Sequence, residues 1–116
     1  MDAHDRAMKI IALPVFYVTR RAGGRRAITH HRTKAAAVAA SKRRLRGTTG
    51  SIDVDECDRT TCRVVAQVRA VETFRPSAQR KGGRWTRTVS VASGAGALPH
   101  GAANRVYVLN GARRRR

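Results

Sequence analysis

The octet "SIDVDECD" holds most of the side chains in this sequence that could do metal or acid–base chemistry. The chain has seven acidic residues, and four of them lie in the octet: Asp53, Asp55, Glu56 and Asp58. A nuclease of the two-metal kind needs two or three carboxylates that converge on Mg²⁺ ions. On an extended strand, Asp53 and Asp55 would share one face with Cys57, and the other two acids would share the opposite face. The octet therefore offers one D-x-D pair, which is a common pattern.

The rest of the sequence does not complete a metal site around the octet. Glu72 is the one distant carboxylate that we consider able to join it, and no lysine motif of the usual nuclease sort accompanies it. The EF-hand pattern fails because its glycine and its terminal glutamate are missing. We therefore expect no metal ion, and a metal-dependent nuclease stays an outside alternative. We interpret residues 53–58 as a loop whose carboxylates pair with arginines of the same molecule, each exposed pair contributing a few tenths of a kcal/mol.

The two cysteines and the adjacent histidines are the other candidates for metal or catalytic chemistry. Structural zinc needs four ligands in closely spaced pairs, but His30 and His31 would point to opposite sides of a strand. A disulfide between Cys57 and Cys62 is geometrically possible, yet we expect free thiols because we read the chain as intracellular. The histidines have no partner constellation for general acid–base catalysis. We expect no cofactor and no enzymatic activity.

Positive charge dominates the composition. Lysine and arginine total 25 against seven acids, which gives a net charge of +18. Such a chain is attracted to polyanions, and a strongly basic pI is a usual property of nucleic-acid binders. Arginine outnumbers lysine 21 to 4, which suits bidentate contacts with phosphate and guanine. Codon bias in a GC-rich genome is an alternative source of the arginine excess.

A membrane partner is not expected from this sequence. No apolar run approaches the 18 or so residues of a membrane-spanning helix. An amphipathic helix at a membrane surface needs bulky apolar residues, and the alanine-rich segment 33–46 offers few. The first residues, "MDAHDRAMK", are polar and partly acidic, unlike a signal peptide. We therefore expect an intracellular protein, in the bacterial cytoplasm or nucleoid, or in the virion if it is phage-encoded.

The first third of the chain predicts a strand, a hairpin turn and a second strand. We expect residues 1–7 to be a disordered lead-in. The segment 8–20 is rich in β-branched and aromatic residues, although Pro14 makes 15–21 the better-formed strand. Gly23 and Gly24 suit a tight turn, and the return strand is 25–31.

A helix and three further strands complete the expected fold. Thr33 is a plausible N-cap and Gly47 a plausible stop for an alanine-rich helix. Its buried face would hold Ala35, Val38, Ala39 and Leu45. Alternating patterns predict strands at 62–75, 84–92 and 105–111. We expect one small α+β domain over residues 8–111, with a mostly antiparallel sheet of four to five strands, one helix packed on it, and a disordered basic tail at 112–116.

Residues 15–46 resemble a known type of DNA-binding module. A strand "VFYVTRR", a turn "AGG", a basic strand "RRAITHH" and the helix start "TKAAA" follow one another. This order is similar to the sheet-plus-helix modules of the AP2 type and to the arm-binding domains of phage integrases, which often open the helix with Thr-Lys-x-x-Ala. The resemblance implies that the sheet face enters the major groove while the helix braces it from behind.

Four basic clusters and this resemblance indicate a non-enzymatic nucleic-acid-binding protein. We favour duplex DNA over RNA, held mainly by contacts of arginine and lysine with phosphate, and a phage or mobile-element origin. Sequence readout would come from Arg25, Arg26 and Thr29. Trp85 could stack on an unpaired base, but we expect it in the core. The predicted contact residues are Arg20, Arg21, Arg25, Arg26, Thr29, Lys42, Arg43, Arg44, Arg46, Arg80, Lys81, Arg84, Arg87, Arg113, Arg114, Arg115 and Arg116.

A protein partner is the alternative from another functional class. The chain would then be a small inhibitor or assembly factor that binds through a sheet edge and through the carboxylates of Asp53, Asp55, Glu56 and Asp58. The arginines would be compositional, or would help docking to an acidic protein. The oligomeric state is left open by the sequence.

Overall fold

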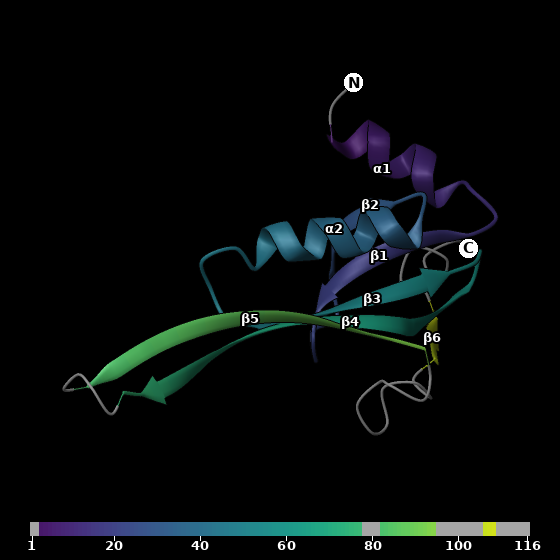
Figure 1. Ribbon diagram of the computed structural model, residues 1–116. Coiled ribbons are helices and arrows are strands. Elements are labelled where there is room, and N and C mark those ends of the chain that lie inside the picture. The colour runs from purple at the N-terminus through teal and green to yellow at the C-terminus, as the bar shows by residue number, and fades with distance from the viewer. Residues whose placement is uncertain (1–2, 78–81, 95–105, 109–116) are drawn as a thin grey trace.

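A single antiparallel sheet with two helices makes up the described part of the chain, which comprises residues 3–77, 82–94 and 106–108 of this computed structural model (Figure 1). The sheet runs in the order β2-β1-β3-β4-β5, and β6 pairs with the start of β4. The elements are α1 (Ala3–Ile11), β1 (Phe16–Arg21), β2 (Ala27–His31), α2 (Lys34–Arg44), β3 (Gly50–Cys57), β4 (Thr61–Pro76), β5 (Gly83–Ser93) and β6 (Val106–Val108). The expected antiparallel sheet is confirmed, but the fold is mostly β and has a second helix.

Helix α1 occupies the segment where we expected a disordered lead-in and the beginning of a strand. It begins at Ala3 and ends at Ile11, with Asp5 in its first turn and Lys9 in its last, which complements the helix dipole. Ile10 and Ile11 pack against a buried cluster that contains Phe16 and Val18. Their β-branched side chains made the segment look extended, but they anchor the end of a helix.

The hairpin and helix that follow form where the sequence placed them. Strand β1 pairs antiparallel with β2, and Gly23 in the turn has a positive φ of 81°. The side chain of Thr33 accepts a hydrogen bond from the backbone N–H of Ala36, so the predicted N-cap is confirmed. Helix α2 ends at Arg44, and Gly47 follows with a φ of 73°.

The buried face of α2 differs from the predicted one. Ala35 and Ala39 are exposed, whereas Ala37 and Ser41 are buried. The Ser41 hydroxyl donates to the carbonyl of Ala37 at 2.9 Å, so this buried polar group is satisfied. Around this face lies the main core of the protein, formed with β3 and β4. Its buried members are Ala37, Leu45, Ile52, Val54, Ala66, Val68 and Ala70, and Val38 packs against them.

A second buried cluster contains both cysteines, and they are not free thiols. Cys57 and Cys62 are opposite each other in the register of β3 and β4, and they form a disulfide with a Cα–Cα distance of 4.0 Å. The prediction of free thiols is therefore wrong. That prediction rested on an intracellular location for the protein. The turn between β3 and β4 instead brings the two cysteine side chains together on one face of a hairpin.

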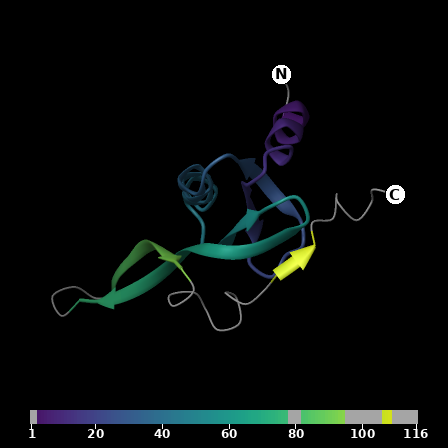
Figure 2. The same ribbon diagram turned by 90° about the vertical axis from the view of Figure 1, so that its right-hand side faces the viewer.

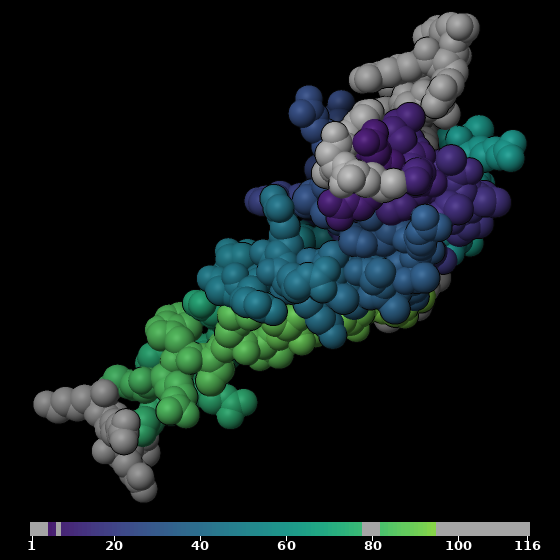
Figure 3. Space-filling view, turned by 90° about the horizontal axis from the view of Figure 1, so that it is seen from above, coloured from purple at the N-terminus to yellow at the C-terminus, as the bar shows by residue number. Residues whose placement is uncertain are grey.

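Strands β4 and β5 extend well beyond the rest of the sheet (Figures 1 and 3). The last pair between β3 and β4 is Gly50 with Ala70, but β4 continues to Pro76. The six further residues span roughly 20 Å at about 3.3 Å per residue. We call this part, residues 71–76 and 83–88, the distal hairpin. Seen end-on in Figure 2, α2 lies above the main sheet, and neither α1 nor α2 is long and apolar enough to cross a membrane.

Candidate nucleic-acid interface

Residues 51–57 of the acidic octet lie in the central strand of the sheet, β3, and only Asp58 belongs to a turn. Ile52 and Val54 belong to the core under α2, so the alternating residues Asp53 and Asp55 lie on the opposite face. Arg20 of β1 is the direct partner of Asp53 in the strand register. Its Nε donates to Oδ2 of Asp55 at 2.9 Å, and its Nη2 lies 3.2 Å from Oδ2 of Asp53. The internal pairing that we expected is thus made by buried groups.

This ion-pair network is a structural element of the sheet. Asp53, Asp55 and Arg20 are exposed by only 1 %, 0 % and 3 %. The amide of Gln67 on β4 donates to the other carboxylate oxygen of Asp53 at 2.9 Å. Two predictions are therefore wrong: Arg20 cannot reach an external phosphate, and Asp53 and Asp55 cannot form a protein-contact surface. In the described ranges, no three His, Cys, Asp or Glu side chains are grouped so that they could hold a metal ion.

The other two acids of the octet also have partners within the chain. The Tyr17 hydroxyl donates to Oε2 of Glu56 at 2.8 Å, and this bond to a carboxylate raises the pKa of the tyrosine. Oδ1 of Asp58 accepts the backbone N–H groups of Thr60 and Thr61, both at 2.9 Å. These two bonds lower the pKa of Asp58 and close the β3–β4 turn. Glu56 thus links β3 to β1, and a contact of Glu56 or Asp58 with a protein partner stays a prediction.

The histidine pair belongs to the edge strand β2, and the pKa of each imidazole is lowered from its ordinary value. Burial lowers the pKa of His30. Burial, the positive charge of Arg43 and the neighbouring His30 lower the pKa of His31. His31 Nε2 lies 2.7 Å from Oγ1 of Thr29, which itself lies beside Oγ1 of Thr19. This arrangement joins β1 to β2.

Thr29 is not placed to read bases from the outer face of the sheet. It is the register partner of Thr19, and Thr19 is the partner of Val54, whose side chain lies in the core under α2. Thr29 therefore points to the helix side, where it is half-buried, and its role as a readout residue stays a prediction. Arg21, Arg25 and Arg26 are exposed at the β1–β2 turn and are free to make contacts there.

The end of α2 presents a second exposed basic group. Lys42, Arg43, Arg44 and Arg46 are exposed, while Leu45 between them is buried in the core. Positive charge at this end also complements the helix dipole. The α2–β3 loop lies against β5, because Nε of Arg87 donates to the carbonyl of Thr48 at 3.0 Å. The basic end of α2 is thereby joined to the base of the distal hairpin.

The distal hairpin has one face that carries arginines and hydroxyls and no acid. Cross-strand partners share a face, so Thr73 lies with Thr86, and Arg75 lies with Arg84. Val68 and Ala70 lie in the core under α2. Side chains alternate along a strand, so Thr73 and Arg75, with their partners, point away from the helix. We call it the outer face. It consists of Val71, Thr73, Arg75, Arg84, Thr86 and Thr88, and Arg69 and Ser90 continue it into the main sheet.

The opposite, inner face of the distal hairpin holds a feature that the sequence did not predict. Trp85 and Phe74 are opposite each other, 65 % and 41 % exposed, with ring centroids 5.2 Å apart at 65°. The expectation that Trp85 lies in the core is wrong, because β5 extends past the end of α2 and no helix covers it there. Its alternation with Arg87, Val89 and Val91 is confirmed, and the extra length of both strands was the signal that could have revealed the exposure.

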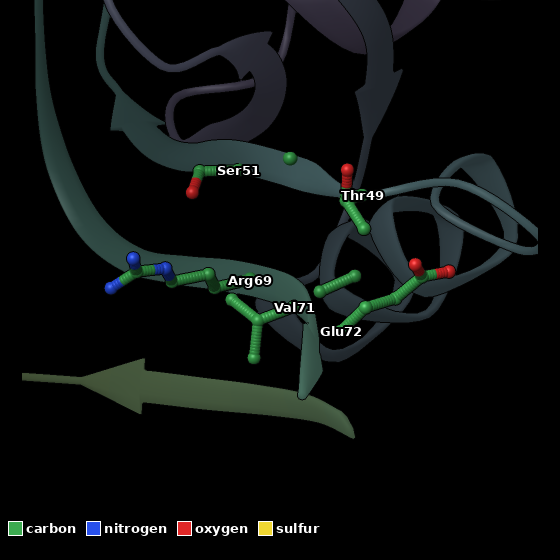
Figure 4. Close-up of a pocket in the computed structure, with 7 residues that line it drawn as sticks. Thr49, Ser51, Arg69, Val71 and Glu72 are labelled. Atoms are coloured by element: carbon green, nitrogen blue, oxygen red, sulfur yellow. The ribbon is translucent and has the colours of Figure 1, made fainter. Parts of the chain in front are cut away.

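A shallow hollow lies at the base of the distal hairpin, where β4 separates from β3. Its volume is about 460 Å³, and it is lined by Thr49, Gly50, Ser51, Arg69, Ala70, Val71 and Glu72. Figure 4 shows the side chains of Arg69 and Glu72 extending in opposite directions from β4. The guanidinium of Arg69 therefore continues the basic outer face, and the hollow is open to an extended ligand.

Several predicted residues cannot be placed in this arrangement. Arg80, Lys81 and Arg113, Arg114, Arg115 and Arg116 lie outside the described residues, as does the predicted tail at 112–116. Neither a protein-family model, nor a curated protein, nor a solved structure matches this chain. The resemblance of residues 15–46 to AP2-type and integrase modules stays a prediction.

Proposed function

We propose that this chain is a non-enzymatic nucleic-acid-binding protein, and that its distal hairpin enters the major groove of duplex DNA. The observation that carries this proposal is the cross-strand pair of Arg75 and Arg84 on a face without acids. Like charges directly opposite each other destabilise a strand pair. A phosphate bound between them would remove that repulsion and would be gripped by two guanidinium forks.

The shape of the distal hairpin supports DNA over RNA. The major groove of B-DNA is about 12 Å wide and admits a two-stranded β-ribbon. The major groove of A-form RNA is deep and narrow, so side chains cannot read it. The arginines of the ribbon reach the phosphates that line the groove, while Thr73, Thr86 and Thr88 add hydroxyl contacts of the kind that set register.

The exposed basic groups next to the distal hairpin extend the same surface. Lys42 lies in the last turn of α2 and Arg46 just beyond its end, and the hydrogen bond of Arg87 to Thr48 fixes this end beside β5. Each phosphate contact releases counterions, so several such residues would add affinity without adding specificity. The proposal therefore assigns Arg25, Arg26 and the end of α2 to phosphate contact and not to base readout.

The proposed compartment follows from the partner and from the disulfide. A closed Cys57–Cys62 bond is typical of oxidising surroundings. Among the places that we consider, a virion meets this condition better than the bacterial cytoplasm or nucleoid. A phage or mobile-element origin is compatible with it. A disulfide retained in protein isolated under thiol-blocking conditions would support a location in the virion. Two free thiols in the same sample would support the cytoplasm.

The test compares two double variants that remove the same charge from opposite ends of the sheet, one in the distal hairpin and one beside the β3–β4 turn. Fluorescence anisotropy at about 150 mM salt would follow binding to a DNA duplex, an RNA duplex and a single strand. We expect Arg75→Ala/Arg84→Ala to weaken DNA binding by roughly tenfold or more, since a charge-assisted hydrogen bond contributes about 1.5–3 kcal/mol. Arg59→Ala/Arg63→Ala is the matched control. Wild-type protein that binds none of the three ligands would refute the proposal.

A further inference from the structure

The inner face of the distal hairpin exposes a pair of aromatic side chains, Trp85 and Phe74. Among the described residues, no helix or loop covers this pair. Trp85 is 65 % exposed, and Phe74 packs against it in an edge-on arrangement. Trp85 is the one tryptophan of the chain, and only 4 % of the residues are aromatic. Aromatic side chains dominate the energetics of cores and interfaces. This chain has few aromatic residues, and two of them lie together and exposed. We therefore treat the pair as a binding surface.

The backbone beside the pair is built to hold the Phe74 ring in place. A Cβ at Gly83 would lie 2.7 Å from Cζ of Phe74 and 2.3 Å from the carbonyl oxygen of Arg75. The absence of a side chain at this position thus lets the ring lie across the strand. Phe74 then supports the indole of Trp85 from one side, and the exposed part of the indole is a flat apolar platform.

The charges around this platform decide what can occupy it. Arg84 flanks Trp85 along β5, Arg75 flanks Phe74 along β4, and Arg87 is two residues from Trp85 on the same face. With a net charge of +18, a second copy of the chain would bring arginines against arginines. A ligand that is flat and apolar at its centre and anionic at its flanks meets both conditions, and this is the chemistry of a nucleobase between its phosphates.

The inner face of the distal hairpin carries one acid, Glu72, and this makes its charge different from that of the outer face. Glu72 lies opposite Arg87, so this part of the inner face carries no net charge and favours a neutral group over a phosphate. The outer face carries Arg75 and Arg84 without an acid. Arg75 and Arg84 project from the face opposite Trp85, so in this arrangement they serve phosphate on the outer face while the inner face takes the base.

We propose that Trp85, supported by Phe74, stacks on an unpaired or unstacked base in the bound nucleic acid. This inference rests on the proposed function and adds a preference for DNA that contains an unpaired base. Stacking on an aromatic side chain contributes enough to change affinity roughly 5- to 150-fold per base. DNA with a bulged base supplies that base without the cost of unstacking a pair. The protein should therefore bind a bulged duplex about tenfold more tightly than a perfect one.

The single tryptophan makes its own fluorescence a direct readout. Wild-type protein is titrated with a perfect duplex and with the same duplex carrying one central bulged base. We expect stronger quenching and tighter binding with the bulged duplex. Variants without the tryptophan are compared with the wild type by the fluorescence anisotropy of labelled duplexes. By that measurement, Trp85→Ala should lose the preference and bind the two duplexes with similar affinity. Trp85→Phe should keep part of the preference, because it keeps a ring.

The outcomes separate this inference from the proposed function. If the wild type binds the perfect duplex but the preference is absent, or survives in Trp85→Ala, the stacking role is overturned and the proposed function stands. If the wild type binds no duplex, both are overturned. A change in tryptophan fluorescence with protein concentration alone would mean that a second copy covers the platform, which also overturns the stacking role.

Discussion

The guanidinium Nε of Arg20 lies 2.9 Å from Oδ2 of Asp55, and both side chains are buried in the middle of the sheet. The bond joins β1 to β3, and Asp53 on the same strand makes the second contact. The other arginines in the described ranges are exposed, whereas this one connects two neighbouring strands from inside. Its removal would leave two carboxylates in the interior without their guanidinium partner.

Replacement of Arg20 should therefore destabilise the fold strongly. We expect Arg20→Leu to lower the free energy of unfolding by about 3 kcal/mol or more, as breaking a buried ion pair does. Arg21→Leu, the exposed neighbour on the same strand, is the matched control and should stay within about 0.5 kcal/mol. Urea denaturation measures both values. Equal effects of the two substitutions would show that the buried network is not important for stability.

Reduction of the disulfide should cost a smaller, definable amount. Cys57 and Cys62 are five residues apart, and closing so short a loop contributes about 2 kcal/mol in the chain-entropy account. A reductant should lower the urea midpoint of the wild type and leave Cys57→Ala/Cys62→Ala unchanged. Two titratable thiols in native protein without reductant would contradict the disulfide.

Stability should also fall in mildly acidic solution because of the histidine pair. The pKa values of His30 and His31 are lowered from the ordinary value by burial. Below a pH of about 6.5 the unfolded chain takes up protons that the folded chain resists, so the free energy of unfolding decreases as the pH falls. Above that pH the term is constant. Denaturation curves between about pH 7.5 and 5.5 measure the slope.

Glutamine variants identify the source of that slope. His30→Gln and His31→Gln keep a polar side chain that does not titrate in this range. The pH dependence should become weaker in each variant and weakest in the double variant. A slope of unchanged size in the double variant would assign it to other groups.

Gly83 should control the position of the aromatic pair. Gly83→Ala would place a methyl group against the Arg75 carbonyl and the Phe74 ring, so the tryptophan emission of Trp85 should shift. Gly82→Ala is the control: its φ of 90° makes an alanine costly by about 1–2 kcal/mol, but nothing lies within 4 Å of the new methyl group. Emission that shifts equally in both variants would contradict a specific contact of Gly83 with Phe74.

Local patterns in the sequence located β1, β2, β4, β5 and α2, because alternation and the Thr33 N-cap depend on near neighbours. They missed the central strand β3, whose acidic residues we expected in a loop. They failed where long-range contacts decide. Ile10 and Ile11 are β-branched, yet they end a helix because Phe16 and Val18 lie beneath them. The burial of Arg20 depends on carboxylates more than thirty residues away.

The candidate site was predictable in its charge and not in its geometry. The basic segment around Arg84 and Arg87 was visible in composition. That Arg75 faces Arg84, and that Trp85 is exposed beside Phe74, follows from the register of two strands that outlast the rest of the sheet. The length of β4 and β5 was a readable signal of this extension, but the point at which β3 and α2 stop covering them depends on long-range contacts.

The salt dependence of binding tests most directly whether the distal hairpin holds DNA phosphates. Each phosphate that the protein neutralises adds about 0.9 to the magnitude of the slope of log K against log salt. Because Arg75 and Arg84 share one phosphate, we predict that Arg75→Ala/Arg84→Ala reduces this magnitude by about 1, and that Arg59→Ala/Arg63→Ala leaves it close to the wild-type value. Identical slopes for the wild type and the Arg75→Ala/Arg84→Ala variant would contradict the proposed role of the distal hairpin.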